Sequence, residues 1–277
     1  MPSLFEPIQI GAISAPNRIV MAPLTRNRAA AGRMPSALMA TYYTQRASAG
    51  LIVSEATQIS PSGQGYLDTP GIYDAAQVAA WRLVTDAVHG ANGYLLDQFL
   101  RDSINDRSDA YGGSRENRAR LPLDVLRAVV AEIGAERTGL RLSPVTPSND
   151  AGQDSDPQGL FNHLVNQLNP LRLAYIHVIE GATGGARDVA PFDFAALKAC
   201  YQQGHERGVW IVNNGYTRAM ALAAVADGAA DAVAFGKPFI SNPDLVARLR
   251  ADAPLAPLDP ATLYGGGAAG YTDYAPL

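Results

Sequence analysis

The sharpest cluster of polar residues in this sequence is His89-x-x-Asn92-x-Tyr94, which places an imidazole, an amide and a phenol close together. Imidazole and phenol groups can move protons, so these residue types are suited to acid–base chemistry. By itself, however, a pattern this short is far more typical of a surface loop. Its meaning depends on the sequence around it.

Arg141 stands between two leucines in the apolar segment GLRLSP. A guanidinium inside a strand is costly to bury unless an anion or a hydrogen-bond acceptor pairs with it. One interpretation is a buried salt bridge with an acid such as Glu55 or Glu180. The other is a binding role for the guanidinium.

Two further apolar segments end in glycine-containing turns, Asn213-Asn214-Gly215 and Phe235-Gly236-Lys237. Backbone N–H groups of such turns form a recurrent phosphate site after the last strands of α/β barrels. Ordinary strand-to-helix turns are the plainer interpretation. No GxGxxG opens a helix after the first strand and no GxxxxGK[ST] occurs, so neither a Rossmann dinucleotide site nor a P-loop is expected.

Several classes of function are not favoured. No two histidines have a metal-ligand spacing such as HExxH, and Cys200 is the single cysteine, so we expect no metal site. Asp154 and Asp156 indicate loop and cap residues rather than a glycosidase pair. The net charge of −4 argues against nucleic-acid binding. The chain has no long apolar stretch and no signal-peptide pattern at its start, so we expect no membrane association and a cytoplasmic location.

The elements that must position these residues alternate between short apolar segments and longer amphipathic ones. Apolar strands alternating with helices are typical of parallel β/α units, and 277 residues suit one barrel or one doubly wound sheet. The expected strands are Arg18–Leu24, Gly50–Thr57, Thr138–Pro144, Leu173–Gly181, Val209–Gly215 and Asp231–Phe239. The expected helices are Pro35–Ser48, Ala75–His89, Asn117–Ile133, Pro157–Asn169, Phe194–Gln203, Thr217–Ala226 and Pro243–Arg250. No strand is expected between residues 59 and 137, so the alternation is broken there.

Several long motifs together resemble the Old Yellow Enzyme family of FMN-dependent ene-reductases, and they cover almost the whole chain in the family's order. The resemblance implies a (β/α)8 TIM barrel, FMN bound noncovalently at the carboxyl ends of the strands, and NAD(P)H as the reductant. The motifs are NRIVMAPLTRNRA (17–29), EATQISPSGQGY (55–66), HGANGYLLDQFLRDSINDRSDAYGGSRENRARL (89–121), GLRLSP (139–144), HVIEGATGG (177–185), NNGYT (213–217), FGKPFISNPDL (235–245) and YGGGAAGYTDY (264–274).

The resemblance also implies catalytic roles. His89 and Asn92 would donate hydrogen bonds to the carbonyl or nitro oxygen of a flat, electron-poor substrate, and Tyr94 would protonate its α-carbon. Thr25 would hydrogen-bond the flavin C4 carbonyl and tune the reduction potential. Tyr264 would line the substrate side, although a packed tail aromatic is an alternative.

Cofactor-binding roles follow in the same way. Pro23 and Leu24 would press their backbone on the edge of the flavin ring, and Ala56 would leave room for the ring. Arg141 would lie beside flavin N1 and the C2 carbonyl. Asn213, Asn214, Gly215, Gly236 and Lys237 would bind the phosphate. The family usually has arginine where this chain has Lys237, so phosphate binding with less directional geometry is expected.

One departure from the family explains the broken alternation. In the family, several dozen residues containing the third and fourth strands separate the helix ending in TDAVH from the motif HGANGY. Here both boundaries meet at His89, which indicates an internal deletion, engineered or natural, or residues absent from the sequence. We therefore expect a single FMN-binding domain over residues 1–277, a (β/α)8-type barrel with about six recognisable strands.

Three functions stay open at this point. The first is FMN-dependent reduction of activated alkenes such as enones, maleimides or nitroalkenes, with nitrate esters as a second substrate class. The second is a catalytically impaired barrel that keeps the motifs and tends to self-associate through exposed strand edges. The third and weakest is a barrel with a Schiff-base lysine, for which Lys198 and Lys237 are the only candidates.

Overall fold

The computed structural model describes residues 1–84, 95–147, 152–205 and 208–277. The chain divides into two compact units, which are described separately. The first unit contains Met1–Ala15 and Ala91–Val233, and the second contains Pro16–Gly90 and Ala234–Leu277. That residues 1–277 act as a single FMN-binding domain stays a prediction.

Parallel strands form the centre of the first unit: β5 (Gly139–Leu142), β6 (Tyr175–Ile179) and β7 (Val209–Asn213). The strand order in this unit is β5-β6-β7-β8, where β8 is Ala232–Phe235 and only its first two residues belong to this unit. Asp231 N–H donates to the Trp210 carbonyl at 2.9 Å and so joins the start of β8 to β7. These strands are almost wholly buried, which explains their near-continuous apolar sequences.

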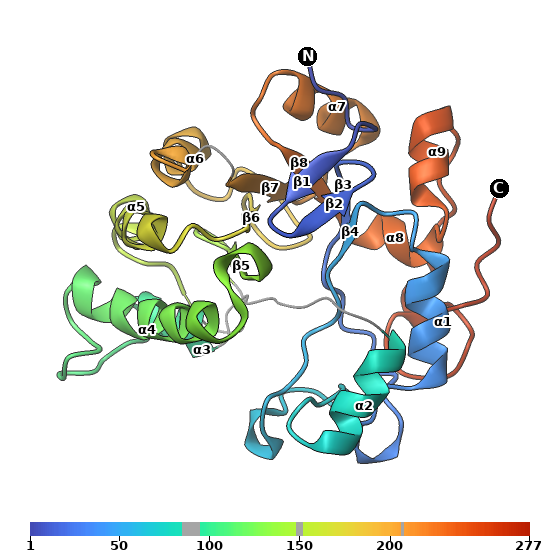
Figure 1. Ribbon diagram of the computed structural model, residues 1–277, viewed down its shortest axis with the longest axis horizontal. Coiled ribbons are helices and arrows are strands. Elements are labelled where there is room, and N and C mark those ends of the chain that lie inside the picture. The colour runs from blue at the N-terminus through green and yellow to red at the C-terminus, as the bar shows by residue number, and fades with distance from the viewer. Residues whose placement is uncertain (85–94, 148–151, 206–207) are drawn as a thin grey trace. The chain divides into compact units, whose positions relative to one another are not determined.

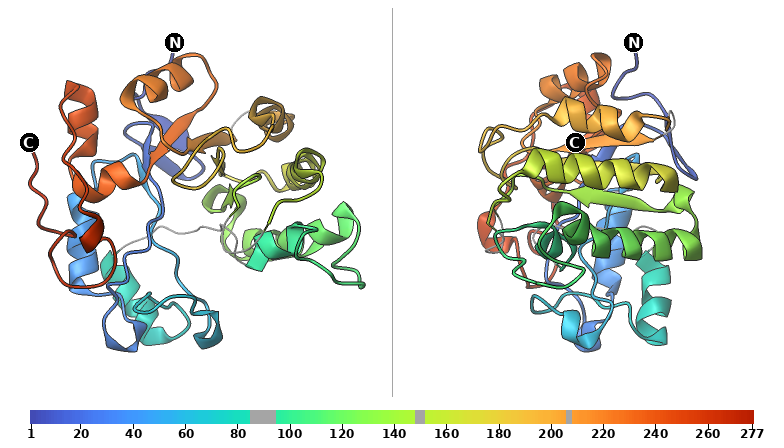
Figure 2. Two further views of the ribbon diagram at one scale, coloured as in Figure 1. Left: turned by 180° about the vertical axis from the view of Figure 1, so that it is seen from behind. Right: turned by 90° about the vertical axis from the view of Figure 1, so that its left-hand side faces the viewer.

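Helices alternate with these strands and pack along them (Figures 1 and 2). α5 shows why the sequence predicts them. Asp156 accepts a hydrogen bond from Gly159 N–H, Pro157 occupies the first turn, and one face of the helix is buried. The helices of this unit are α3 (Leu95–Leu100), α4 (Arg115–Ile133), α5 (Pro157–Leu168), α6 (Phe194–Gln202) and α7 (Arg218–Ala226).

The first unit also contains an antiparallel hairpin that the sequence analysis does not anticipate, β1 (Ile8–Ile10) and β2 (Ile13–Ala15). Its turn contains Gly11, whose φ is +55°. A Cβ at this position would lie 2.0 Å from the Glu136 carbonyl oxygen, so only glycine fits. The strands are too short for an alternating pattern to be visible in the sequence.

The second unit has the strand order β4-β3-β8, in which β3 (Ile19–Met21) and β4 (Leu51–Ile52) are parallel. Ala22 N–H donates to the Phe235 carbonyl at 3.0 Å, which joins β3 to the end of β8. Its helices are α1 (Ala37–Gln45), α2 (Ala75–Val84), α8 (Lys237–Ser241) and α9 (Leu245–Ala251). Short 3-10 turns in the two units are Ala31–Arg33, Pro61–Gly63, Ala135–Arg137, Asn169–Leu171 and Pro260–Thr262.

The two largest differences from the predicted element boundaries are both at the ends of strands. The strand expected over Asp231–Phe239 ends at Phe235, because Gly236 leaves the extended conformation and Pro238 lies in the first turn of α8. The strand expected over Gly50–Thr57 is regular only at Leu51–Ile52. The end of the helix expected over Ala75–His89 lies outside the described residues.

Within the described ranges, none of the helices combines the length and the apolar composition that a membrane span requires. Within the same ranges, no group of three or more His, Cys, Asp or Glu side chains is placed to hold a metal ion.

Candidate active site

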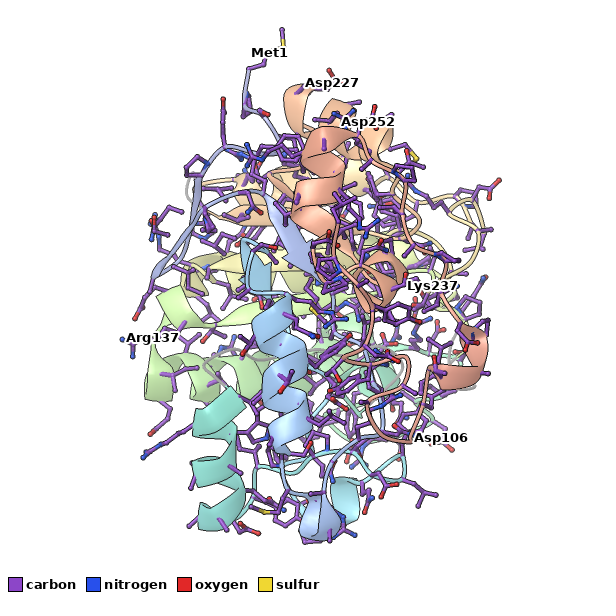
Figure 3. The ribbon with its side chains drawn as sticks, turned by 90° about the vertical axis from the view of Figure 1, so that its right-hand side faces the viewer. Met1, Asp106, Arg137, Asp227, Lys237 and Asp252 are labelled. Carbon is purple, nitrogen blue, oxygen red and sulfur yellow. The ribbon has the colours of Figure 1, made fainter. Side chains whose placement is uncertain are left out.

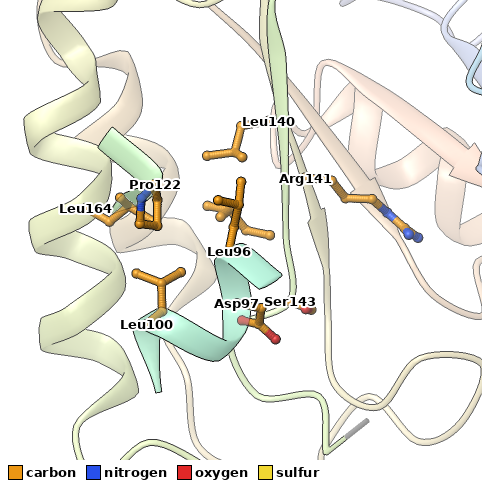
Figure 4. Close-up of a pocket in the computed structure, with 9 residues that line it drawn as sticks. Leu96, Asp97, Leu100, Pro122, Leu140, Arg141, Ser143 and Leu164 are labelled. Carbon is orange, nitrogen blue, oxygen red and sulfur yellow. The ribbon is translucent and has the colours of Figure 1, made fainter. Parts of the chain in front are cut away.

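In the first unit, polar side chains emerge from the otherwise apolar strands β5 and β6. Arg141 on β5 and His177 on β6 are partners in the parallel register, so their side chains leave the sheet on the same face. Leu140 and Leu142 on β5 point to the opposite face, where they line a small apolar pocket with residues of α3, α4 and α5. Figure 4 shows the Arg141 guanidinium extending away from that pocket.

The Arg141 guanidinium is incompletely paired. Its Nη2 donates to Asn213 Oδ1 at 3.1 Å, whereas its buried Nε has no acceptor among the described residues. Within the described part of this unit, Arg141 forms no ion pair. Glu180, one of the two acids considered as its partner, instead pairs with Arg187. Burial lowers the pKa of Arg141 to about 10, so the side chain is still a cation at neutral pH.

His177 is 1% exposed and its Nε2 has no hydrogen-bond partner among the described residues. Burial, together with the positive charge of Arg141, holds the pKa of His177 well below its usual range. The imidazole is therefore neutral at physiological pH. The interpretation of His177 as a core or barrel-lining residue is confirmed.

Asn213, Asn214 and Gly215 lie at the carboxyl end of β7, as predicted. The Asn214 side chain is buried and fixes the loop after β6: Nδ2 donates to the carbonyls of Glu180 and Ala182, and Oδ1 accepts from Gly184 N–H. Any contact of Asn214 with a phosphate must therefore use its backbone. Gly215 has φ +64° and is exposed, with open space where a Cβ would stand.

In the second unit, Pro23, Leu24 and Thr25 follow β3, and Ala56 follows the neighbouring strand β4. The first three are partly exposed and Ala56 is exposed. The Thr25 hydroxyl makes no hydrogen bond within the described residues. The parallel pairing of β3 and β4 thus brings these four residues to one edge of this unit. Their contact with a flavin stays a prediction.

Glu55 is a buried acid at the same edge, 2% exposed. Its Oε2 accepts a hydrogen bond from Arg26 N–H at 3.4 Å, and its Oε1 has no partner among the described residues. Burial raises the pKa of Glu55 to about 7, although the hydrogen bond from Arg26 N–H and the charges of Arg26 and Arg28 oppose this rise. The carboxyl group fixes the backbone directly after Thr25.

Gly236 and Lys237 follow β8, and Lys237 is the exposed first residue of α8 (Figure 3). Tyr264 lies in the C-terminal segment of the same unit and is 65% exposed. Its hydroxyl makes no hydrogen bond with the described residues. The alternative of a packed tail aromatic therefore does not apply to Tyr264, whereas Tyr271 in the same segment is fully buried.

The three remaining predicted site residues, His89, Asn92 and Tyr94, lie outside the described residues. Their proposed roles rest on the sequence motif alone.

Comparison with known proteins gives the family. The sequence profile of the NADH:flavin oxidoreductase / NADH oxidase family matches residues 3–90 and 87–256. The chain belongs to this family. The resemblance to Old Yellow Enzyme is thereby confirmed, and with it the assignment as an enzyme that uses FMN and a nicotinamide reductant.

Individual members of the family match over nearly the whole chain. 12-Oxophytodienoate reductase 1 of Oryza sativa subsp. japonica is 35% identical over 362 residues, covering 98% of this chain and 92% of that protein. A probable flavin mononucleotide-dependent alkene reductase of Leishmania infantum is 35% identical over 363 residues, covering 98% of this chain and 96% of that protein.

Solved structures support the fold class. Morphinone reductase in complex with tetrahydroNAD matches with a TM-score of 0.90 and 35% identity, covering 100% of this chain and 98% of that one. The Old Yellow Enzyme homologue from Zymomonas mobilis matches with a TM-score of 0.92 and 35% identity, covering 100% of both chains. The predicted (β/α)8 TIM-barrel type, with six of its strands recognisable, is confirmed.

The comparisons also support the internal deletion. An alignment over 362 residues against a chain of 277 leaves at least 85 aligned positions without a residue in this chain. The two matched ranges of the family profile meet at residues 87–90, which include the expected junction at His89.

The residues present fit a flavin. A buried guanidinium nitrogen without an acceptor is unfavourable unless a ligand completes it. Flavin N1 and the C2 carbonyl are acceptors of the kind that Arg141 lacks. The unpaired hydroxyl of Thr25 fits the C4 carbonyl in the same way.

The sequence analysis missed three buried arginines of the second unit, Arg26, Arg28 and Arg46. The run LTRNR at the end of an apolar strand was the available signal, since charged residues directly after a buried strand need partners. Those partners are mostly backbone carbonyls, which a sequence pattern does not reveal.

Proposed function

We propose that this enzyme reduces activated C=C bonds, in enones, maleimides or nitroalkenes, with NAD(P)H as the electron source. The observation that carries the proposal is Arg141, a buried cation with an unsatisfied Nε beside Asn213. A cation in this state favours a group that gains negative charge on reduction. The names of two relatives, an alkene reductase and a 12-oxophytodienoate reductase, support the substrate class.

When bound, FMN would supply the hydride that adds to the β-carbon of the alkene. Arg141 would donate hydrogen bonds toward flavin N1 and the C2 carbonyl, and Thr25 would donate toward the C4 carbonyl. Pro23 and Leu24 would contact the edge of the flavin ring through their backbone, and Ala56 would leave room for the ring. The phosphate is bound by backbone N–H groups of Asn213, Asn214, Gly215 and Gly236 and by the charge of Lys237.

Substrate activation falls to the motif at the junction. His89 and Asn92 donate hydrogen bonds to the substrate oxygen, which lowers the energy of the negative charge that develops there. Tyr94 gives a proton to the α-carbon, and Tyr264 lines the substrate side. Nitrate esters are a second substrate class.

The test separates the two half-reactions. In Tyr94→Phe, the oxidation of reduced enzyme by an enone should slow by about 100-fold or more, because the phenol is the proton donor only in that step. Reduction of the flavin by NAD(P)H should change less than about twofold, and stopped-flow absorbance follows both rates. Equal slowing of the two would contradict the role of Tyr94 as general acid.

A second candidate function rests on the absence of at least 85 aligned positions. We propose as the alternative a barrel that keeps the family motifs without turnover and self-associates through its strand edges. Flavin absorbance of the purified protein separates the candidates, since a colourless protein that does not take up added FMN supports only the alternative. The cytoplasmic location stays a prediction.

A further inference from the structure

The C-terminal segment of the second unit is held by buried arginines rather than by a hydrophobic cluster alone. Arg26 and Arg28 are 1% and 5% exposed, yet neither forms an ion pair within the described residues. Their guanidinium groups bond to carbonyl oxygens of the segment from Thr262 to Gly270, which we call the tail loop.

The hydrogen bonds are numerous and short. Arg26 Nε donates to the Leu263 carbonyl at 2.8 Å and Nη2 to the Gly270 carbonyl at 2.8 Å. Arg28 Nη2 donates to the Thr262 carbonyl at 2.9 Å and to the Ala269 carbonyl at 3.1 Å. Hydrogen bonds from charged donors are stronger than neutral ones, so these contacts fix the loop firmly.

Tyr264 is the residue enclosed by these contacts. The carbonyl before it, of Leu263, accepts from Arg26 Nε and from Arg28 Nη1 at 3.3 Å. The N–H after it, of Gly265, donates to the Arg26 carbonyl at 2.9 Å. The backbone of Tyr264 is therefore fixed on both sides, while its side chain is 65% exposed.

An aromatic ring completes the support. Tyr271 is fully buried and stacks on Tyr42, with ring centroids 4.1 Å apart. The guanidinium carbons of Arg26 and Arg28 lie 5.0 and 4.5 Å from the centre of the Tyr271 ring. Cations over an aromatic face are stabilised without a carboxylate partner, which leaves their N–H groups for the carbonyls of the tail loop.

We propose that Arg26 and Arg28 are positioning residues that hold Tyr264 at the substrate side of the active site and so help to set substrate specificity. The proposal rests on the proposed function, which assigns Tyr264 to the substrate. The two buried arginine side chains fix the backbone around one exposed tyrosine, which is explained by a need for the Tyr264 side chain to be held in place before substrate binds.

The chain provides a matched control. Arg46 is 0% exposed and its guanidinium lies 3.7 Å from the centre of the Tyr42 ring, so it belongs to the same stack. Its short hydrogen bonds go to the Phe239, Ile240 and Tyr42 carbonyls, and only one contact, at 3.4 Å, reaches the segment from Thr262 to Tyr271. Arg46→Lys should therefore lower stability without loosening Tyr264.

The experiment compares Arg28→Lys, Arg46→Lys, Tyr264→Phe and the double variant Arg28→Lys/Tyr264→Phe. Lysine keeps the charge of Arg28 but cannot reach several carbonyls at once. In Arg28→Lys, the amide hydrogens of residues 263–270 should exchange at least about tenfold faster, whereas those of β3 and α8 should not change. In Arg46→Lys, exchange in residues 263–270 should stay within about twofold of the parent.

The kinetic measurement uses cyclohexenone as the alkene. Arg28→Lys should raise KM by about tenfold with little change in flavin reduction by NAD(P)H, because misplacing a substrate contact affects only alkene binding. In the Tyr264→Phe background the Arg28 substitution should have much less effect, since residues that act through one another are not additive.

Two results would overturn the proposal: unchanged exchange in residues 263–270 of Arg28→Lys, or kinetic effects of Arg28→Lys and Tyr264→Phe that multiply independently. A different result would contradict the proposed function. If no variant or parent reduces the alkene, the alkene-reductase assignment is wrong, while the exchange measurement still decides whether Arg28 holds the tail loop.

Discussion

Two buried charged residues, Arg141 and Glu55, show how local environment turns an ordinary side chain into a candidate functional group. Arg141 keeps its charge but lacks an acceptor at Nε, and Glu55 keeps one unpaired oxygen while burial raises its pKa to about 7. Among the described residues of its own unit, neither forms a simple salt bridge. Each therefore gives a direct experimental prediction.

Replacing Arg141 tests the flavin role. Arg141→Ala should weaken FMN retention and lower the flavin reduction potential by roughly 30–60 mV, the equivalent of about 1.4–2.8 kcal/mol for a two-electron couple. Removal of a cation makes the reduced, more negative flavin less favourable. Spectroelectrochemistry measures the potential, and Arg127→Ala on the exposed face of α4 is the control. An unchanged potential would exclude this role for Arg141.

The raised pKa of Glu55 predicts that the stability of the protein depends on pH. Because its pKa rises from 4.5 to about 7 on folding, the folded chain holds a proton that the unfolded chain has released between these values. The contribution of Glu55 to the free energy of unfolding therefore falls as pH rises from about 4.5 to 7, by on the order of 3 kcal/mol at most.

Glu55→Gln removes the titrating carboxyl group, so the variant should not lose stability from this source as pH rises. The free energy of unfolding of the variant should therefore increase relative to that of the parent from pH 5 to pH 8. Urea unfolding at several pH values gives the comparison. Glu132→Gln on the exposed face of α4 is the control, and its stability profile should run parallel to that of the parent. A Glu55→Gln profile parallel to that of the parent would show that the carboxyl does not titrate in this range.

At the scale of elements, side-chain hydrogen bonds help to hold the short strands β3 and β4 together. β3 and β4 share only two register pairs, Val20 with Leu51 and Met21 with Ile52. The buried Asn17 adds to them: its Oδ1 accepts from Ile19 N–H at 3.0 Å and Gly50 N–H at 2.9 Å, and its Nδ2 donates to the Ser48 carbonyl. One amide thus joins the beginnings of both strands.

Asn17→Ala should lower the free energy of unfolding by about 1–3 kcal/mol, because it leaves a buried N–H without its acceptor. Urea denaturation followed by circular dichroism measures the change. Gln9→Ala, which removes an exposed side-chain contact with the Gly11 carbonyl, should cost less than about 0.5 kcal/mol. Similar losses in both variants would argue against a special role of Asn17.

At the scale of the whole molecule, the family positions that this chain lacks have a consequence for two strands. β5 stands at the end of the strand order of the first unit, and β4 stands at the end of that of the second. Within the described residues of each unit, β5 pairs only with β6 and β4 only with β3. Unpaired strand edges favour pairing with another chain, and buried unpaired backbone groups cost about 1–3 kcal/mol each. Since whole domains are stable by only about 5–15 kcal/mol, we expect these edges to require a partner.

The expected result is reversible self-association between micromolar and millimolar concentration, measured by light scattering, together with a lower melting temperature than a full-length relative. Inserting the segment of a relative at His89 should reduce both effects. A cooperatively melting monomer at high concentration with a full complement of FMN would contradict this prediction, and would mean that the strands satisfy one another within one chain.

The class of fold, the family and the position of the deletion can all be predicted from the amino-acid sequence alone. Apolar segments such as Val209–Asn213 identify buried parallel strands without a structure, because burial on both faces imposes a continuous apolar pattern. Caps such as Asp156-Pro157 fix a helix start locally, so α5 begins where the sequence predicts. The β1–β2 hairpin and the end of β8 could not be predicted in this way, because three-residue strands and the break at Gly236 carry too little pattern.

Which polar groups find hydrogen-bond partners depends on the folded structure. LTRNR reads as a basic run, yet Arg26 and Arg28 are buried against carbonyls more than 230 residues away in the chain. The motif GLRLSP is compatible with either a salt bridge or a binding role for Arg141. The structure shows that Arg141 lies beside His177 in the strand register and donates a hydrogen bond to Asn213. Partners of this kind depend on which segments folding brings together, and carbonyl oxygens, present at every residue, leave no mark in a sequence.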